Sequence, residues 1–459
     1  MSWTLCIDFG TAYSKAAVAP SDTWSRLDPG RIRPLMLGGE SQGANTFLLP
    51  SAVFVDDTRI LFGGAAIARA AALADKKRAA LKSFKTLLSV SDLDRALNTG
   101  VPASIDPHRL FSMGDLITLY LAYLGASIDR AIAADSVLER FAAFDRRYAA
   151  PAWRGGDSTG LHGVVMGVFG QAEAARDLLG NDVLAADGIS IENAKNAVTR
   201  ARDSDRVAEM GLIFEATAAA AYTSVGLDVD TPALIIADMG AGTTDIAVLA
   251  RAGARIEELP EARLTLKQAG DYIDSIIANL ILAANPRVKK LSEQGALWSA
   301  AMRSMRGFKE TLFAEGRASM RHEGKVTTVT LRALENHKDF RVFARAVGDA
   351  YDAALETASK YVTMHGRREI QSVAVGGGAH APFIQELIRR KPKRGGKVQV
   401  IPRPPTPDWA HAAEFQGNLA PVFPQLAIAI GGAIAPAEML AAGATPAAVV
   451  RSGSRVAPG

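Results

Sequence analysis

Residues 5–19 (LCIDFGTAYSKAAVA) begin as an apolar strand, turn at Asp8-Phe9-Gly10-Thr11 and continue with a second, mostly apolar run. Residues 234–249 (LIIADMGAGTTDIAVL) repeat this order with the same spacing. The shared positions are Asp8, Gly10, Ser14, Ala17 and Val18 in the first segment and Asp238, Gly240, Thr244, Ala247 and Val248 in the second. Internal similarity of this kind predicts two related half-molecules, each beginning with the same β-hairpin.

The turns of both segments suit the binding of a polyphosphate. Glycine lets the backbone turn tightly with its N–H groups pointing outward, and such nests bind anions. Thr11, Thr243 and Thr244 add hydroxyl donors. Asp8 and Asp238 cannot bind phosphate directly, but Mg²⁺ and its waters can lie between a carboxylate and a phosphate. The two segments together therefore predict a clamp that closes on a Mg-nucleotide from both sides.

Either segment alone is also compatible with an ordinary β-hairpin, in which Asp-x-Gly is common. Their joint occurrence after two buried strands favours the phosphate site. Two competing phosphate motifs do not fit. The chain has no GxxxxGK[ST] motif, and GAGTTD lacks the third glycine of a dinucleotide fingerprint and precedes a strand-like run.

Composition limits the class of protein. A chain of 459 residues is long enough for at least two domains, and 48% apolar and 22% charged residues are typical of a soluble globular protein. A net charge of +4 does not indicate a nucleic-acid binder, and the basic run at 389–397 reads as a solvated loop. The single cysteine, Cys6, excludes an intrachain disulfide. We expect a cytoplasmic protein without a signal peptide or membrane span, since residues 425–442 are too short and too weakly apolar to cross a bilayer.

Strand-like and helix-like runs alternate along the chain, which indicates an α/β fold. A strand, a glycine turn and a helix are expected at 372–390, and a strand-like run, RYAAPAW, at 147–153. The tail at 436–459, rich in alanine, proline and glycine, is expected to be disordered. Helices are expected at 63–98, 112–147, 170–210, 268–284, 291–315 and 424–435.

Five segments resemble, in family order, the ATPase superfamily of actin, sugar kinases and DnaK-type heat-shock-70 chaperones, and they resemble the heat-shock branch most. They are IDFGTAYSKAAVA, FEATAAAAY, LIIADMGAGTTDIAVL, SVAVGGGAHAPFIQELI and FPQLAIAIGGAI. The resemblance implies an α/β protein with a two-lobed actin-like ATPase fold that closes over ATP or ADP with Mg²⁺. Residues 1–210 would form the first lobe and 211–435 the second, and the chain would lack the family's C-terminal peptide-binding domain.

The resemblance also implies roles for individual residues. Asp8 and Asp238 would hold Mg²⁺ through water, Glu215 would position the attacking water, and Thr243 would assist catalysis. Lys309 matches the lysine on the helix that covers the adenine. The loop residues expected around the nucleotide are Gly10, Thr11, Ala12, Tyr13, Gly240, Ala241, Gly242, Thr244, Gly376, Gly377 and Gly378.

The sequence departs from the family pattern at positions that matter for catalysis. Ala12 replaces a threonine, Ala241 a glycine and Ala216 a proline; His380 and Glu310 stand where the family has basic residues near the adenine. The position of the family's catalytic lysine falls near Ile67, with Arg69 two residues later. Nucleotide binding is therefore a firmer expectation than ATP hydrolysis, which should be slow.

Three functions agree with this pattern. The first is a heat-shock-type, Mg-ATP-dependent switch that acts on an unidentified protein partner or client. The second is a small-molecule kinase of the same superfamily, although no sugar-kinase signature is visible. The third is an actin-like filament protein, against which the longer chain argues. Residues 154–205 exceed the length usual for the heat-shock branch and are read as an added surface feature.

Overall fold

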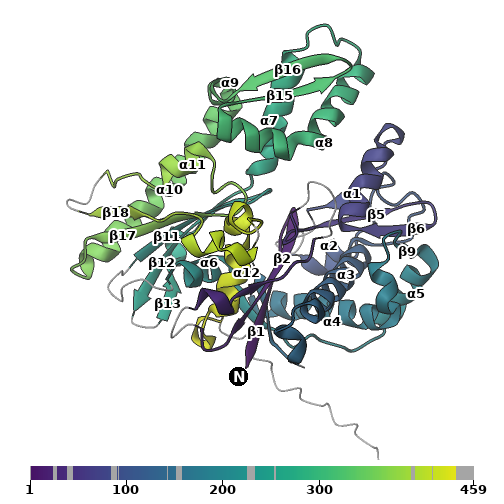
Figure 1. Ribbon diagram of the computed structural model, residues 1–459, viewed down its shortest axis with the longest axis horizontal. Coiled ribbons are helices and arrows are strands. Elements are labelled where there is room, and N and C mark those ends of the chain that lie inside the picture. The colour runs from purple at the N-terminus through teal and green to yellow at the C-terminus, as the bar shows by residue number, and fades with distance from the viewer. Residues whose placement is uncertain are drawn as a thin grey trace, which may run out of the picture.

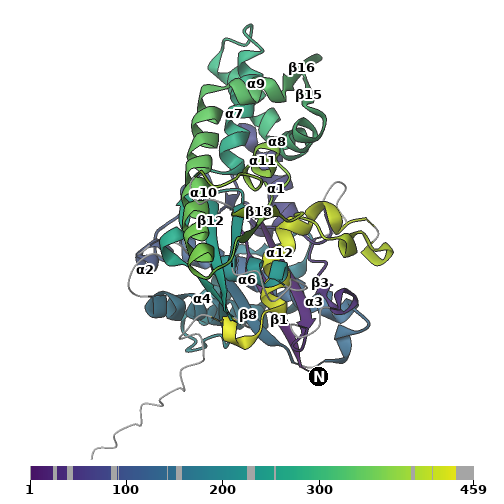
Figure 2. The ribbon, with the colours of Figure 1, turned by 90° about the vertical axis from the view of Figure 1, so that its left-hand side faces the viewer.

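The computed structural model describes residues 2–23, 28–38, 45–83, 90, 92–141, 143–150, 158–224, 233–252, 255–393, 398–415 and 417–440. Within these residues helices and mixed sheets alternate, so the predicted α/β class is confirmed. Figures 1 and 2 show the N-terminal and C-terminal halves of the chain around separate sheets, with the last long helix near the centre.

The first large sheet has the order β10-β8-β1-β2-β3, with β4 paired to β2. Its strands are β1 (Trp3–Phe9), β2 (Tyr13–Pro20), β3 (Arg33–Pro34), β4 (Leu49–Pro50), β8 (Asp145–Ala150) and β10 (Gly211–Phe214). The β1–β2 hairpin is antiparallel, whereas β1, β8 and β10 are parallel neighbours. Because β10 completes this sheet, the first structural unit extends to Phe214, beyond the predicted limit at 210.

The second large sheet has the order β13-β12-β11-β17-β18, with β14 paired to β12. Its strands are β11 (Ala233–Met239), β12 (Thr244–Ala252), β13 (Arg255–Glu258), β14 (Leu264–Leu266), β17 (Glu369–Val375) and β18 (Gln399–Pro402). The β11–β12 hairpin is antiparallel, and β11, β17 and β18 are parallel. The two sheets thus share one topology.

The register of the two hairpins is also the same. Asp8 lies opposite Lys15 across the first hairpin, and Asp238 lies opposite Asp245 across the second. Since a shift by one residue would exchange the faces of a strand, equal register gives equivalent residues equivalent orientations. The internal repeat in the sequence is therefore a repeat in three dimensions.

A central layer lies between the two sheets. It contains the buried helices α6 (Glu215–Ser224) and α12 (Phe423–Ile434) together with Cys6 of β1 and Ile236 of β11. Side chains alternate between the faces of a strand, so residues two apart share a face. Asp8 follows Cys6 by two residues and Asp238 follows Ile236 by two, so both carboxylates lie on the faces directed at this layer.

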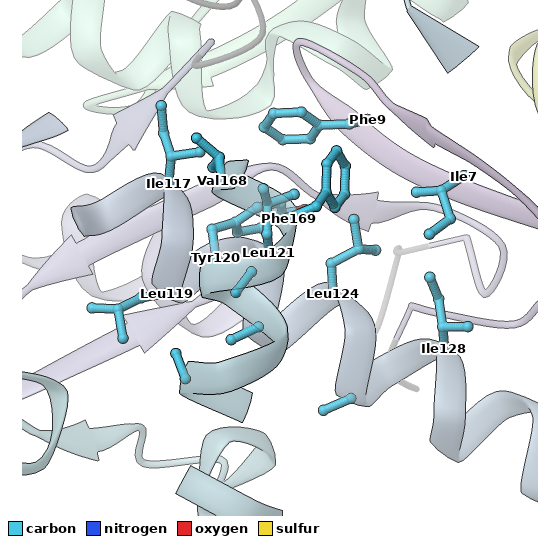
Figure 3. Close-up of a cluster of buried hydrophobic side chains, with 14 of the residues drawn as sticks. Ile7, Phe9, Ile117, Leu119, Tyr120, Leu121, Leu124, Ile128, Val168 and Phe169 are labelled. Atoms are coloured by element: carbon cyan, nitrogen blue, oxygen red, sulfur yellow. The ribbon is translucent and has the colours of Figure 1, made fainter. Parts of the chain in front are cut away.

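The opposite face of the first sheet carries its own core. Figure 3 shows Ile7 and Phe9 of β1 beside Tyr120 and Phe169, which come from the helices α3 (Met113–Ala134) and α4 (Ser158–Leu179). The rings of Phe9 and Tyr120 stack with centroids 5.7 Å apart. The prediction that 154–205 is a surface addition is wrong for its described part, because α4 contributes a row of buried apolar residues to this core.

Three predicted helical runs are shorter than expected, and the run at 170–210 contains the end of α4, the strand β9 (Ile189–Ser190) and α5 (Ile191–Arg202). The run at 63–98 contains α1 (Gly63–Ala72), the short strand β7 (Leu81–Lys82) and α2 (Leu93–Leu97). The run at 112–147 contains α3, which ends at Ala134, and the beginning of β8. Burial of β8 between β1 and β10 outweighs the helical preference of its residues.

The remaining elements surround the two sheets. They are β5 (Ala52–Val55), β6 (Arg59–Phe62), β9 (Ile189–Ser190), α5 (Ile191–Arg202), α7 (Gly270–Ala283), α8 (Leu291–Glu315), β15 (Arg317–His322), β16 (Lys325–Thr330), α9 (Leu331–Asn336), α10 (Lys338–Met364) and α11 (Pro382–Leu387). At the end of the described chain, Met439 is buried, so the packed structure runs past the predicted limit at 435; residues 441–459 lie outside the described part.

Of the helices that the structure describes, α3 alone is long and apolar enough to cross a membrane. Most of its apolar window is buried within the protein. Its burial against β1 and α4 is what a core helix of this composition requires.

Candidate functional site

Asp8 forms a buried ion pair with Lys15 in the first hairpin. Lys15 Nζ lies 2.6 Å from Asp8 Oδ2, and the side chains are only 11% and 1% exposed. The pair follows from the register, because the two residues face each other directly across the strands. Lys15 was absent from the sequence-based candidates. The sequence contained one indication of the pair, because Lys15 follows the turn by as many residues as Asp8 precedes it.

The turn after Asp8 is tight around the lysine. A Cβ atom on Gly10 would lie 2.2 Å from the Tyr13 carbonyl oxygen and 2.9 Å from Lys15 Nζ. No side chain fits there, so glycine is required by the space as well as by the turn. Lys15 thus places a positive charge directly beneath the first predicted phosphate loop.

A chain of buried hydroxyl groups supports this loop from below. Ser51 Oγ donates to the Gly10 carbonyl oxygen at 2.8 Å and lies 3.1 Å from Ser14 Oγ. The Tyr120 hydroxyl donates to Ser14 Oγ at 2.9 Å. Burial raises the pKa of Tyr120, so its hydroxyl stays protonated and remains a donor. The helix α3 therefore fixes the position of the first loop.

The second predicted loop is closed by its own backbone. The Gly240 N–H donates to the Thr243 carbonyl oxygen at 3.0 Å, and Thr244 Oγ1 donates to the Gln268 carbonyl oxygen at 2.8 Å. Thr244 is fully buried, whereas Gly240 and Thr243 are half-buried. Thr244 is therefore committed to holding the loop, and the half-buried atoms before it are the ones available to a ligand.

The predicted adenosine loop lies directly beside Asp238. Gly376 has φ +80°, and a Cβ there would lie 2.3 Å from Asp238 Oδ1. A Cβ on Gly378 would lie 2.6 Å from the side chain of Met239. Gly377 is more open, with Gln425 of α12 as its near neighbour. The first and third glycines are thus required by close approach, and β11, the 376–378 turn and α12 meet at one place.

Lys309 lies against the second loop from the side of α8. Its Nζ is 2.6 Å from Asp274 Oδ1 and 3.3 Å from the Gly270 carbonyl oxygen. The Gly270 N–H in turn donates to the Gly240 carbonyl oxygen at 3.2 Å. Burial raises the pKa of the Asp274 carboxyl, while Lys309 opposes that rise. The structure thus brings Lys309 to the backbone that supports the second loop.

Glu215 is the first residue of α6 and is half-buried. Both Glu215 and Asp8 act electrostatically on the Cys6 thiol, whose pKa burial raises strongly. The carboxylates of Asp8 and Glu215 therefore both lie near the buried Cys6 thiol of β1. Cys6 itself is fully buried and protonated, which makes its thiol unreactive.

Tyr13 joins the first hairpin to the second half of the molecule. The guanidinium carbon of Arg306, on α8, lies 4.9 Å from the centroid of the Tyr13 ring. Thr11 is half-buried and Ala12 is exposed in the same turn. No local sequence signal identifies Arg306, because it is distant in the chain from Tyr13.

Arg69, two residues after the position of the heat-shock family's catalytic lysine, does not take the place of that lysine. Arg69 Nε lies 2.5 Å from Asp56 Oδ2, which holds this side chain beside the β5–β6 turn. Ile67 is 36% exposed on the same helix. Lys82 of β7 is exposed and acts electrostatically on Asp271, at the start of α7 in the second half. Lys15 is thus the lysine in contact with the first loop, whereas Lys309 lies beside the second.

The donor set fits a cation held through water rather than one bound directly. Among the residues that the structure describes, no group of three or more His, Cys, Asp or Glu side chains could hold a metal ion. Asp8 and Asp238 each border a glycine whose Cβ space is occupied by backbone or charged atoms. These carboxylates suit Mg²⁺, which keeps several water ligands; the ion remains a prediction.

No model of a known protein family matches the chain, and no curated protein sequence matches it.

Proposed function

We propose that this protein is a Mg-ATP-dependent conformational switch of the heat-shock-70 type, with a two-lobed actin-like ATPase fold and slow ATP hydrolysis. The nucleotide would bind between the β1–β2 and β11–β12 hairpins. Its opening and closing would act on a protein partner or client.

The observation that carries the proposal is the duplicated hairpin. Both hairpins have the same register, and both direct an aspartate, Asp8 or Asp238, toward the layer that contains α6 and α12. Each aspartate is followed by a glycine turn that contains half-buried residues, such as Thr11 and Thr243. Two such units facing one layer suit a ligand that needs N–H donors for phosphate and carboxylates for a hydrated cation.

The residues around the two loops would have different roles in binding and hydrolysis. Asp8 and Asp238 would orient the waters of Mg²⁺, which supplies charge neutralisation when bound, and the two loops would hold the phosphates. Glu215 would orient the attacking water from the start of α6. Gly376 and Gly378 would keep the adenosine side of the site narrow, because neither position has room for a side chain.

Lys15 offers a cation where the sequence comparison with the heat-shock branch finds none. Its ammonium lies next to Gly10, so a phosphate on the loop would meet a buried positive charge. A fixed cation stabilises the charge that develops in phosphoryl transfer. Because Asp8 already neutralises part of this charge, we expect Lys15 to favour binding more than turnover.

The test is Mg-ATP binding by calorimetry together with single-turnover hydrolysis. We expect Asp238→Asn to weaken binding about tenfold in Mg²⁺ and far less in EDTA, because its role passes through the ion. Glu215→Gln should leave affinity within about twofold but slow hydrolysis by about two orders of magnitude. Asp57→Asn, at an 81% exposed carboxylate, is the matched control.

The proposal fails if wild-type protein binds neither ATP nor ADP. It also fails if Asp238→Asn binds Mg-ATP as tightly as the Asp57→Asn control, since the carboxylate would then have no part in the site.

A further inference from the structure

A groove of about 670 Å³ runs between α8 and β15, away from the hairpins. The strand side consists of five consecutive residues, Ala318 to His322, so residues from both faces of β15 line it. Consecutive residues of a strand point to opposite faces, so a groove that is lined by all of them runs along the edge of the strand. The helix side is formed by Ala300, Arg303, Ser304, Gly307, Phe308 and Thr311.

The groove and the candidate nucleotide site occupy opposite sides of α8. Residues 300, 304, 307 and 311 recur at helical spacing and share one face. Arg306 and Lys309, which point toward the hairpins, lie about half a turn away around the helix. The groove therefore does not belong to the site described above, and Figure 1 shows the β15–β16 hairpin with α7 and α8 at the far end of the second half.

The outer edge of β15 has no strand partner among the described residues, where β15 pairs with β16 alone. His322 lies opposite Lys325 around a two-residue turn in which Glu323 and Gly324 both have positive φ. In a turn of this type the two flanking residues, here His322 and Lys325, form backbone hydrogen bonds with each other. Hydrogen-bonded and non-hydrogen-bonded residue pairs then alternate along the hairpin. The backbone of Ser319 and of Arg321 therefore points outward, along the groove.

The groove is positively charged. Arg303, Arg321 and His322 line it, and no carboxylate does. Within the part of the chain that the structure describes, neither arginine makes an ion pair, whereas other exposed arginines such as Arg69 do. Phe308 and Met320 supply an apolar floor. The combination of unpaired backbone, two arginines without partners and an apolar floor suits an extended, acidic polypeptide.

We propose that the groove between α8 and β15 binds an extended acidic segment of a partner protein, which adds a third strand to the β15–β16 sheet. Backbone bonds to the outward groups of Ser319 and Arg321 would supply affinity, and Arg303 with Arg321 would select acidic side chains. The lined length of α8, about 16 Å, accommodates about five residues of an extended strand.

The probe is a fluorescein-labelled peptide of about eight residues that alternates aspartate and valine, measured by anisotropy with the full chain at about 0.1 M salt. We expect saturable binding, and at least about tenfold weaker binding by Arg303→Glu with Arg321→Glu. Arg332→Glu, an exposed arginine on α9 outside the groove, should change binding less than about twofold.

Two further measurements test the mode of binding. Ser319→Pro removes an outward N–H on β15, while Thr328→Pro removes one on the far edge of β16; the two side chains face each other and bond at 2.8 Å, so both changes disturb the hairpin alike. Only Ser319→Pro should weaken the peptide, by about fivefold or more. Two peptides should be compared, each N-methylated at alternate amides so that it loses the N–H donors of one edge. The peptide that loses the donors facing β15 should no longer bind the unchanged protein.

Several outcomes overturn the inference. Equal binding of the peptide with lysine in place of aspartate would remove the charge argument. Equal effects of Ser319→Pro and Thr328→Pro, or unchanged binding of both alternately N-methylated peptides, would exclude strand addition. Tighter binding of single-stranded DNA at the same arginines would assign the groove to nucleic acid. None of these outcomes bears on ATP binding.

Discussion

At the scale of single residues, the Asp8–Lys15 pair carries the most consequence. Its partners are 2.6 Å apart and almost fully buried, so both charges have left water. A buried pair of this kind contributes little net stability, yet removing one partner is costly because the other charge stays buried. A requirement for both charges at the loop therefore accounts for the pair better than stability does.

A double-mutant cycle tests this requirement. We expect Lys15→Met to lower the free energy of unfolding by about 3–5 kcal/mol, because the Asp8 carboxylate would lose its ammonium. The neutral pair Asp8→Asn with Lys15→Met should regain much of that loss in denaturant titrations. If the double variant is as stable as wild type and still binds Mg-ATP normally, the pair has no part in the site.

At the scale of elements, the crossing of α6 and α12 determines how the two sheets meet. A Cβ on Gly431 would lie 1.8 Å from the Ala218 carbonyl oxygen, and one on Gly432 would lie 2.3 Å from Cys6 Sγ. Glycine at 431 therefore lets α12 approach α6 this closely, and glycine at 432 lets α12 approach β1. Arg147 of β8 then donates to the Gly432 carbonyl oxygen at 3.1 Å, which ties the end of α12 to the first sheet.

Gly431→Ala should therefore destabilise the protein by about 1–3 kcal/mol or more, because the added methyl forces the helices apart. Gly295→Ala on α8, where a Cβ would meet nothing within 4 Å, should instead stabilise it by about 0.5–1 kcal/mol through helix propensity. Thermal and urea unfolding compare the two directly. Equal effects of the two substitutions would contradict the close crossing.

At the scale of the whole molecule, the contact between Tyr13 and Arg306 links the first hairpin to α8. The ring and the guanidinium are 4.9 Å apart, and Arg306 also pairs with Glu310 at 2.9 Å. The two residues belong to different halves of the chain. Any motion that separates the halves must break this contact, so it helps to hold the two halves in their present arrangement.

We expect Arg306→Ala to loosen that arrangement. Loss of a partly buried cation–π contact is worth about 1 kcal/mol, or about fivefold in local opening. Hydrogen exchange should rise both in residues 10–13 and in the neighbouring turns of α8. Thr311→Ala, on the groove-lining face of the same helix and away from Arg306, serves as the control, and a rise restricted to α8 would show that Arg306 does not bridge the halves.

Much of the local structure followed from the sequence. The apolar strands, the glycine turns and the spacing of residues 5–19 and 234–249 predicted two hairpins, and the structure has them in one common register. Helices such as α7, α8 and α12 also lie close to their predicted ranges. These features depend on neighbours a few residues apart, which a sequence displays directly.

The tertiary structure alone decided which distant groups meet. It placed β8 and β10 beside β1, made α4 part of a core, brought Lys309 to Asp274, and set Arg306 over Tyr13. It also opened the groove between α8 and β15. Contacts between residues far apart in the chain arise from burial shared by whole elements, and no local pattern encodes them. The sequence by itself determined a repeated turn suited to phosphate, whereas packing determined which charges and helices surround it.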